Sequence, residues 1–125
     1  MATPEWAPDR ALPGAVADRM PRFAGDLINA AVAAAFTVPL AELRATTRRR
    51  APVALARQSA MYLAHVAFGL NFTDVGRAFG RDRTTAAHAC RRIEDRRAEP
   101  RLDAALAELE HALRRDIGAT SGAMS

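Results

Sequence analysis

Lysine is absent from this 125-residue sequence, so all 18 of its Lys and Arg side chains are arginine. The lysine that a glycine-rich phosphate-binding loop requires is therefore missing, and this excludes an ATPase of that class. A single cysteine, Cys90, excludes an internal disulfide and a zinc site built from several cysteines. No apolar run approaches the ~20 residues that span a bilayer. We predict neither a membrane partner nor a nucleotide cofactor.

Aromatic residues are also scarce, at 6% of the chain, whereas alanine is abundant and β-branched runs are lacking. Alanine is the strongest helix former, and the core must be built from closely packed helices rather than bulky rings. We expect an all-α, compact multi-helix domain. The start of the chain lacks the basic residues and apolar run of a signal peptide, so we expect a cytoplasmic, nucleoid-associated protein.

Positive charge is concentrated in the middle of the chain. Residues 44–97 hold 12 arginines and 4 acidic residues, a net charge of +8, whereas the two flanks together carry −4. An arginine-rich composition alone does not separate the two signs along a sequence. The segregation indicates a surface that faces a polyanion, and nucleic acid is the favoured partner.

Proline and hydrophobic periodicity divide the chain into three parts. Four prolines in residues 1–22 predict a flexible tail, residues 23–116 form the domain, and residues 117–125 form a disordered tail. Helices are expected over residues 26–36, 39–43, 52–68, 73–79, 83–97 and 101–115. The first of these is apolar nearly all round and should be the most buried.

The last two predicted helices each have an apolar stripe. In the helix over 83–97 the core side is formed by Ala86, Ala89, Cys90 and Ile93. The last helix has a seam made by Leu102, Ala105, Leu106, Leu109 and Leu113. This seam either covers the core or pairs with another copy of the chain, and we favour the first.

Two short helices, over 73–79 and 83–97, are joined by the tight turn of residues 80–82, which is the pattern of a helix-turn-helix. Asp82 is placed to cap the second helix. The outward side of that helix carries polar groups that can bond base edges or phosphates: Arg83, Thr84, Thr85, His88 and Arg91. The pattern predicts a recognition helix for duplex DNA.

Three segments carry a resemblance to a known family: ARQSAMYL at 56–63, FTDVGRAFG at 72–80 and RDRTTAAHACRRIE at 81–94. They resemble the C-terminal DNA-binding domain of the bacterial replication initiator DnaA, and the similarity spans roughly residues 24–97. The resemblance implies a fold related to the Trp-repressor group and binding to DnaA-box-like sites. The helix expected over residues 101–115 is then an extra C-terminal helix.

The resemblance also suggests roles by position. Arg49, in the run Arg48, Arg49 and Arg50, matches an arginine that enters the minor groove. Other matched positions contact the phosphate backbone or the bases: Arg57, Gln58, Phe72, Thr73, Asp82, Arg83, Thr84 and Thr85. Arg81, in the turn, is a further candidate DNA-binding residue. His65 stands where the family can have a lysine that contacts the backbone.

Two departures from the family pattern bear on specificity. The family usually reads Gly-Gly-Arg-Asp-His-Thr-Thr, whereas this chain lacks one glycine and has Arg83 in place of the histidine. Arginine prefers the two acceptors of guanine to the methyl group of thymine, so the preferred DNA sequence is expected to differ.

These features predict sequence-specific binding of double-stranded DNA, in the regulation of chromosomal replication initiation, by what resembles a freestanding copy of the DNA-reading region. Two alternatives stay open: a helix-turn-helix transcriptional regulator, and a protein-interaction module that modulates the replication initiator without binding DNA. The initiator or its regulators are candidate partners. The three histidines are too far apart for a local metal site, and no residues have the spacing of a catalytic set. We predict no metal, no cofactor and no enzymatic activity.

Overall fold

The computed structural model describes the backbone of residues 14–44 and 51–124 and the side chains of residues 23–44 and 51–115. Within this part the chain forms six helices and no strand. The helices are α1 (Gly14–Phe36), α2 (Leu40–Arg44), α3 (Ala51–Val66), α4 (Phe72–Phe79), α5 (Arg83–Arg96) and α6 (Pro100–Met124). The expectation of an all-α domain is confirmed. No described helix is both long enough and apolar enough to cross a membrane.

The central helix is α3, which contacts each of the other five helices. Its buried residues are Val53, Ala56, Ser59, Ala60, Met61, Tyr62, Leu63 and Ala64. The expectation that α1 is the most buried helix is therefore wrong. Several α1 alanines, among them Ala30 and Ala34, face solvent. Alanine is small enough for its exposure to cost little, so an apolar composition did not require burial on all sides.

The ends of the described helices extend beyond the predicted ones. Residues 14–22 belong to α1, so the prediction that this stretch remains an extended tail is wrong. Three of the four N-terminal prolines precede Gly14, and Pro21 is the one proline inside the helix. A single proline removes one backbone hydrogen bond but need not end a helix of 23 residues.

The last helix is also longer than predicted. Residues 117–124 continue α6, which corrects the prediction of a disordered tail there. Extending a helix that is already formed is much easier than nucleating one, and Gly118 and Gly122 each cost only about 1 kcal/mol relative to alanine. Residue 125 lies outside the described part.

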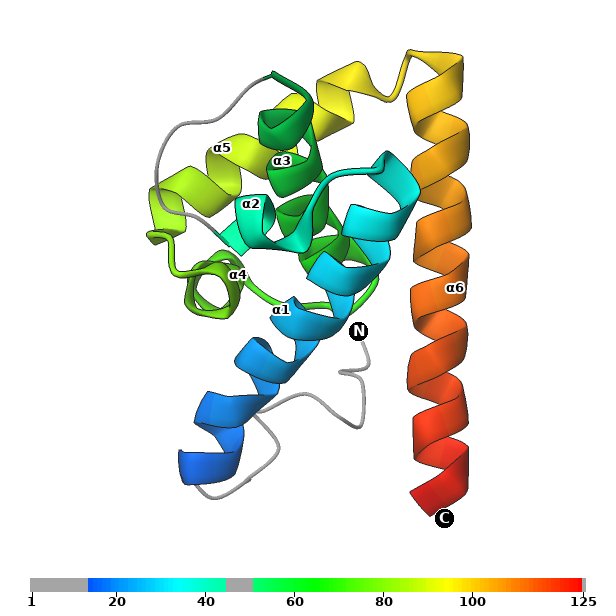
Figure 1. Ribbon diagram of the computed structural model, residues 1–125. Helices are drawn as coiled ribbons and strands as arrows, with labels where there is room; N and C mark the ends of the chain where they lie inside the picture. Colours follow the sequence, from blue (N-terminus) through cyan, green and yellow to red (C-terminus); the bar gives the residue numbers. More distant parts are fainter. Residues whose placement is uncertain (1–13, 45–50, 125) are drawn as a thin grey trace.

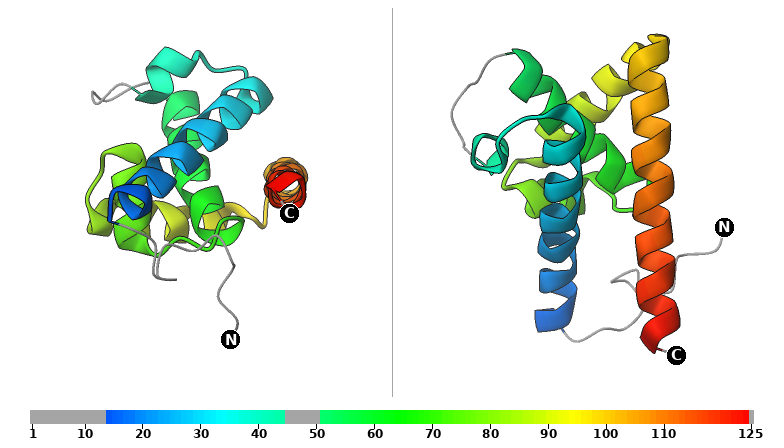
Figure 2. Two further views of the ribbon diagram at one scale, coloured as in Figure 1. Left: turned by 90° about the horizontal axis from the view of Figure 1, so that it is seen from below. Right: turned by 45° about the vertical axis from the view of Figure 1, so that its right-hand side comes forward.

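Figure 1 shows α1 and α6 running in opposite directions, with α3, α4 and α5 gathered on one side of α1. In Figure 2 α6 is seen end-on beside the other helices, so only one of its sides meets the domain. That side is formed by Leu102, Leu106, Leu109 and Leu113, which are all buried in the core. The seam therefore covers the core, as favoured from the sequence, although Ala105 is only half-buried.

A charged cluster centred on Arg97 also holds α6. The Arg97 Nε donates to Asp103 Oδ1 over 2.6 Å, and its Nη1 donates to the Tyr62 hydroxyl over 3.0 Å. Nη1 also lies 3.6 Å from Glu110 Oε1. Arg97 thus joins the end of α5 to both α3 and α6. Glu110 forms a second ion pair with Arg114, the i,i+4 pair expected from the sequence.

Candidate nucleic-acid interface

The α4–α5 pair has the close approach of a helix-turn-helix. Gly80 ends α4 in the left-handed conformation, with φ of 67°, and the backbone N–H of Arg81 donates to the carbonyl of Gly76 over 2.8 Å. A Cβ at Gly76 would collide with the Arg81 carbonyl oxygen. Glycine at both positions therefore allows the chain to reverse within three residues.

The start of α5 is capped as predicted. Asp82 Oδ1 accepts a hydrogen bond from the Thr85 backbone N–H over 2.7 Å. This bond, together with one from the Thr85 side chain, lowers the pKa of the Asp82 carboxyl below its usual 3.8. The carboxylate therefore stays ionised near neutral pH at the start of α5.

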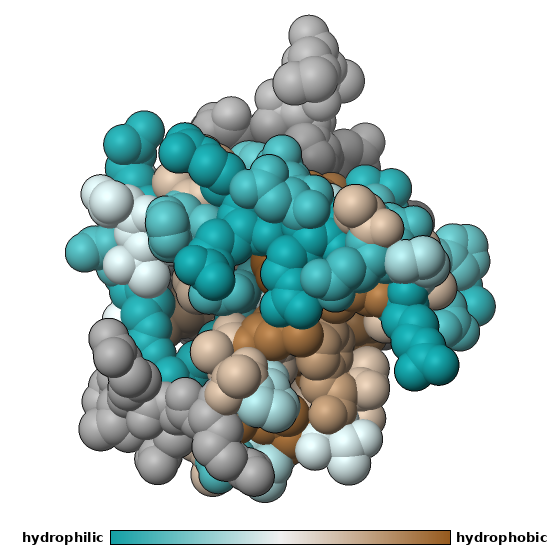
Figure 3. Space-filling model, turned by 90° about the horizontal axis from the view of Figure 1, so that it is seen from above, coloured by the Kyte–Doolittle hydropathy of each residue, from teal (hydrophilic) through white to brown (hydrophobic). Residues whose placement is uncertain are grey.

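The two sides of α5 differ in character. The four residues predicted to face the core, Ala86, Ala89, Cys90 and Ile93, are all buried. Arg83, Thr84, Thr85, His88 and Arg91 are exposed, as predicted. Thr84, His88 and Arg91 follow a spacing of four and three residues, so they share one side of the helix. Seen from above in Figure 3, hydrophilic residues cover much of the surface and flank a smaller hydrophobic area.

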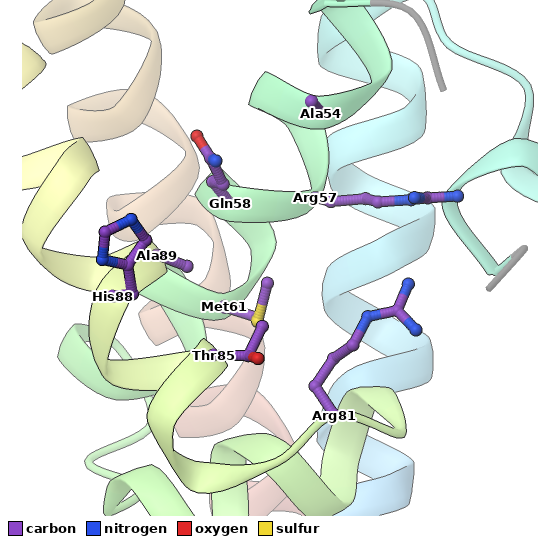
Figure 4. Close-up of a pocket in the computed structure, with 8 residues that line it drawn as sticks. All are labelled: Ala54, Arg57, Gln58, Met61, Arg81, Thr85, His88 and Ala89. Carbon is purple, nitrogen blue, oxygen red and sulfur yellow. The ribbon is translucent and has the colours of Figure 1, made fainter. Parts of the chain in front are cut away.

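A shallow, open pocket of about 210 Å³ lies between α3 and the α4–α5 turn. Five of the predicted site residues line it: Arg57, Gln58, Arg81, Thr85 and His88. In Figure 4 Arg81 reaches from the turn towards the guanidinium end of Arg57, while Gln58 and His88 lie on the other side of Met61 and Thr85. The pocket thus joins side chains from α3, the turn and α5.

Arg57 is held in place from its far end. Its Nη2 donates to the backbone carbonyl of Glu42, in α2, over 2.7 Å. This bond spans 15 residues of sequence and links α3 to the helix that precedes the arginine run. A guanidinium is planar, so this bond also fixes the orientation of the other N–H groups of Arg57.

Met61 and Ala54 also line the pocket and were not predicted as site residues, whereas Ala89 was predicted only to face the core. Met61 follows Gln58 by three residues and Ala54 precedes it by four, so helical spacing places all three on one side of α3. This spacing is the signal in the sequence that could have identified Ala54 and Met61. It does not show which helix packs opposite these residues.

The remaining predicted residues fall elsewhere. Phe72 and Thr73 lie in the first turn of α4 and do not line the pocket. Thr73 is exposed, and the Phe72 ring is half-buried and stacks on His65 at a centroid distance of 4.6 Å. Arg48, Arg49 and Arg50 lie outside the described residues. Their predicted role is therefore untested.

Comparison with known proteins places this arrangement in a family. A family model described as the bacterial dnaA protein helix-turn-helix matches residues 26–93. The chromosomal replication initiator protein DnaA 1 of Protochlamydia amoebophila is 38% identical over 87 residues, covering 70% of this chain and 17% of that protein. DnaA of Caulobacter vibrioides is 47% identical over 75 residues, covering 59% of this chain and 15% of that protein.

A solved structure, of the replication initiator DnaA bound to AMPPCP and single-stranded DNA, aligns with a TM-score of 0.68 and 26% identity. The alignment covers 80% of this chain and 30% of that one. The chain spans no more than about a fifth of the length of these curated relatives. The segment matched by the family model holds the second half of α1, all of α2, α3 and α4, and most of α5. By its sequence and its fold, the chain belongs to the bacterial DnaA helix-turn-helix family.

Proposed function

We propose that this chain binds double-stranded DNA in a sequence-specific manner, at DnaA-box-like sites, and acts in the regulation of chromosomal replication initiation. The observation that carries the proposal is the gathering of Arg57, Arg81 and Thr85 around one pocket beside the exposed start of α5. The family supports it, since the relatives are named as chromosomal replication initiators.

The recognition element in this proposal is α5. The major groove of B-DNA is about 12 Å wide and admits one helix whose outward side is polar. The apolar side of α5 docks on α3, which leaves Thr84, His88 and Arg91 facing outward along two turns. Asp82 and Arg83 stand at the exposed start of the helix, where side chains reach the base edges first.

The pocket beside α5 is the proposed phosphate site. A phosphate has several acceptor oxygens, and Arg57, Gln58 and Arg81 line the pocket with side chains that carry N–H groups. Backbone contacts of this kind fix the register of a recognition helix and leave the reading of bases to other side chains.

The arginine run completes the proposed interface. We retain the prediction that Arg49 enters the minor groove, with Arg48 and Arg50 beside it, since the Arg57 bond to Glu42 in α2 keeps the preceding helix close to the pocket. Narrow minor grooves attract arginine through their negative potential. The replication initiator or its regulators are the proposed protein partners.

The test begins with selection from a pool of random duplexes, followed by affinity measurements on the selected site. We expect the selected duplex to bind at least about 10³ times more tightly than unrelated duplexes, and more tightly than either of its single strands. The single-strand comparison matters because a related structure is described as holding single-stranded DNA. Equal binding to all duplexes, or preference for single strands, would contradict the proposal.

The biological role needs a separate experiment. Immunoprecipitation of chromatin with the full chain should give peaks over the replication origin. Peaks restricted to promoters would instead identify a transcriptional regulator. A protein that binds no duplex but still captures the replication initiator would be an interaction module.

A further inference from the structure

The side chain of His65 bridges the connection between α3 and α4. Its Nδ1 lies 2.8 Å from the carbonyl oxygen of Leu70, five residues further along the chain. The same ring stacks on Phe72, with ring centroids 4.6 Å apart and an interplanar angle of 28°. The imidazole therefore touches the residue before the cap of α4 and the first residue of that helix.

The hydrogen bond to Leu70 settles which nitrogen carries the hydrogen. A carbonyl oxygen only accepts, so Nδ1 must donate, and Nε2 of the neutral ring then holds a lone pair. A lone pair cannot donate to a phosphate oxygen. In this tautomer the His65 ring offers no donor at Nε2, so it does not reproduce a lysine that contacts the DNA backbone.

The connection that His65 braces determines where α4 begins. Gly69 has a φ of 70°, and the backbone N–H of Leu70 donates to the Ala64 carbonyl over 3.2 Å. The Asn71 side chain then caps α4 by accepting from the Asp74 backbone N–H over 2.8 Å. Thr73 is exposed in the first turn that follows. Movement of this connection would displace Phe72 and Thr73 together.

We propose that His65 is a positioning residue for DNA binding, which holds Phe72 and Thr73 in place at the start of α4 without contacting DNA itself. The inference rests on the proposed function, because it assumes that the start of α4 meets DNA. It assigns to this position a role different from that of a lysine on the phosphate backbone.

Three substitutions separate the two contacts of the ring. His65→Phe keeps an aromatic ring against Phe72 but removes the donor to Leu70. His65→Asn keeps a donor near the place of Nδ1 but removes the ring. His65→Ala removes both. His111→Ala is the matched control, since His111 is an exposed histidine on α6.

The affinity of each variant is measured at pH 8 for a duplex selected by the unmodified protein, over a range of salt concentrations. Thermal melting followed by circular dichroism checks that each variant is folded at the assay temperature. We expect His65→Ala to weaken duplex binding about fivefold or more. His65→Phe and His65→Asn should lose less affinity, and the control His111→Ala should lose none. The salt slope should not change, because no phosphate contact is lost.

The His65→Ala substitution is also made in a variant that already carries Phe72→Ala and Thr73→Ala. If His65 acts through Phe72 and Thr73, His65→Ala has almost no further effect on duplex affinity in that variant. Three results would overturn the inference: a salt slope reduced by about one, an unchanged affinity, or an equal loss in both backgrounds. Failure of the unmodified protein to bind any duplex would instead refute the proposed function.

Discussion

The carboxylate of Asp82 and the backbone N–H of Thr85 are joined by a 2.7 Å hydrogen bond at the exposed start of α5. Asp82→Ala should lower the melting temperature, because it leaves an N–H of the first turn without its cap. The same hydrogen bond lowers the pKa of Asp82, so the stabilisation exists above pH 3.8 and is lost as the pH falls through the folded-state pKa.

Thermal melting over a pH series checks this prediction. The difference between the unmodified protein and Asp82→Ala should be largest near neutral pH and shrink below about pH 4. Asp95→Ala is the control, since Asp95 is an exposed carboxylate on the same helix. A difference in melting temperature that is independent of pH would contradict the capping role.

Arg83 should read guanine. A guanidinium matches the O6 and N7 acceptors of guanine in the major groove, and such a pair contributes about 1–3 kcal/mol of discrimination. Selected duplexes should therefore contain a fixed guanine whose replacement by 7-deazaguanine, which lacks the N7 acceptor, weakens binding. Arg83→His should abolish this sensitivity. Equal sensitivity in the two proteins would show that another residue reads that base.

Gly76→Ala tests the close approach of the turn to α4. The added Cβ would collide with the backbone carbonyl of Arg81, which cannot rotate away as a side chain can. We expect a loss of about 1–3 kcal/mol in unfolding free energy, measured by urea denaturation, and weaker duplex binding. Ala78→Gly is a useful comparison because it changes the same helix without adding an atom. Gly76→Ala with wild-type stability would refute the predicted clash.

Arg97→Met should loosen α6 while leaving the DNA interface intact. It removes the bonds to Asp103 and Tyr62 and leaves Glu110 without one of its two arginines. The Tyr62 hydroxyl and Asp103 raise the pKa of Arg97, so its charge persists across the pH range of these measurements. Hydrogen exchange should become faster in residues 100–115, with unfolding free energy lower by about 1–3 kcal/mol. A marked loss of duplex affinity would place Arg97 in the interface instead.

Local patterns in the sequence predicted most of α4 and α5. Apolar spacing identified the buried side of α5, including Cys90, and burial raises the pKa of that thiol to about 11. The Asp82 cap and the Gly80 turn followed from the conformational preferences of those residue types. Each of these features depends on residues within about one turn of each other.

Features that join distant segments were not predicted. The bond from Arg57 to the Glu42 carbonyl and the contacts of Arg97 with Tyr62 and Glu110 span 13 to 35 residues. Helical periodicity shows which side of a helix is apolar but not which helix packs against it. Long polar side chains add to the difficulty, since Arg57 and Arg97 have many rotamers and their partners depend on the tertiary fold.

The salt dependence of duplex binding tests the central claim most directly. The measurement compares the unmodified protein with two double variants. The pocket variant is Arg57→Ala/Arg81→Ala, and the α6 variant, Arg101→Ala/Arg115→Ala, is a control that removes two exposed arginines from α6. Affinity of the unmodified protein should fall by about 10³ or more between 50 and 200 mM salt. The pocket variant should have a slope shallower by about two, and the α6 variant an unchanged slope. Equal slopes for the two variants would contradict the assignment of DNA binding to the pocket beside α5.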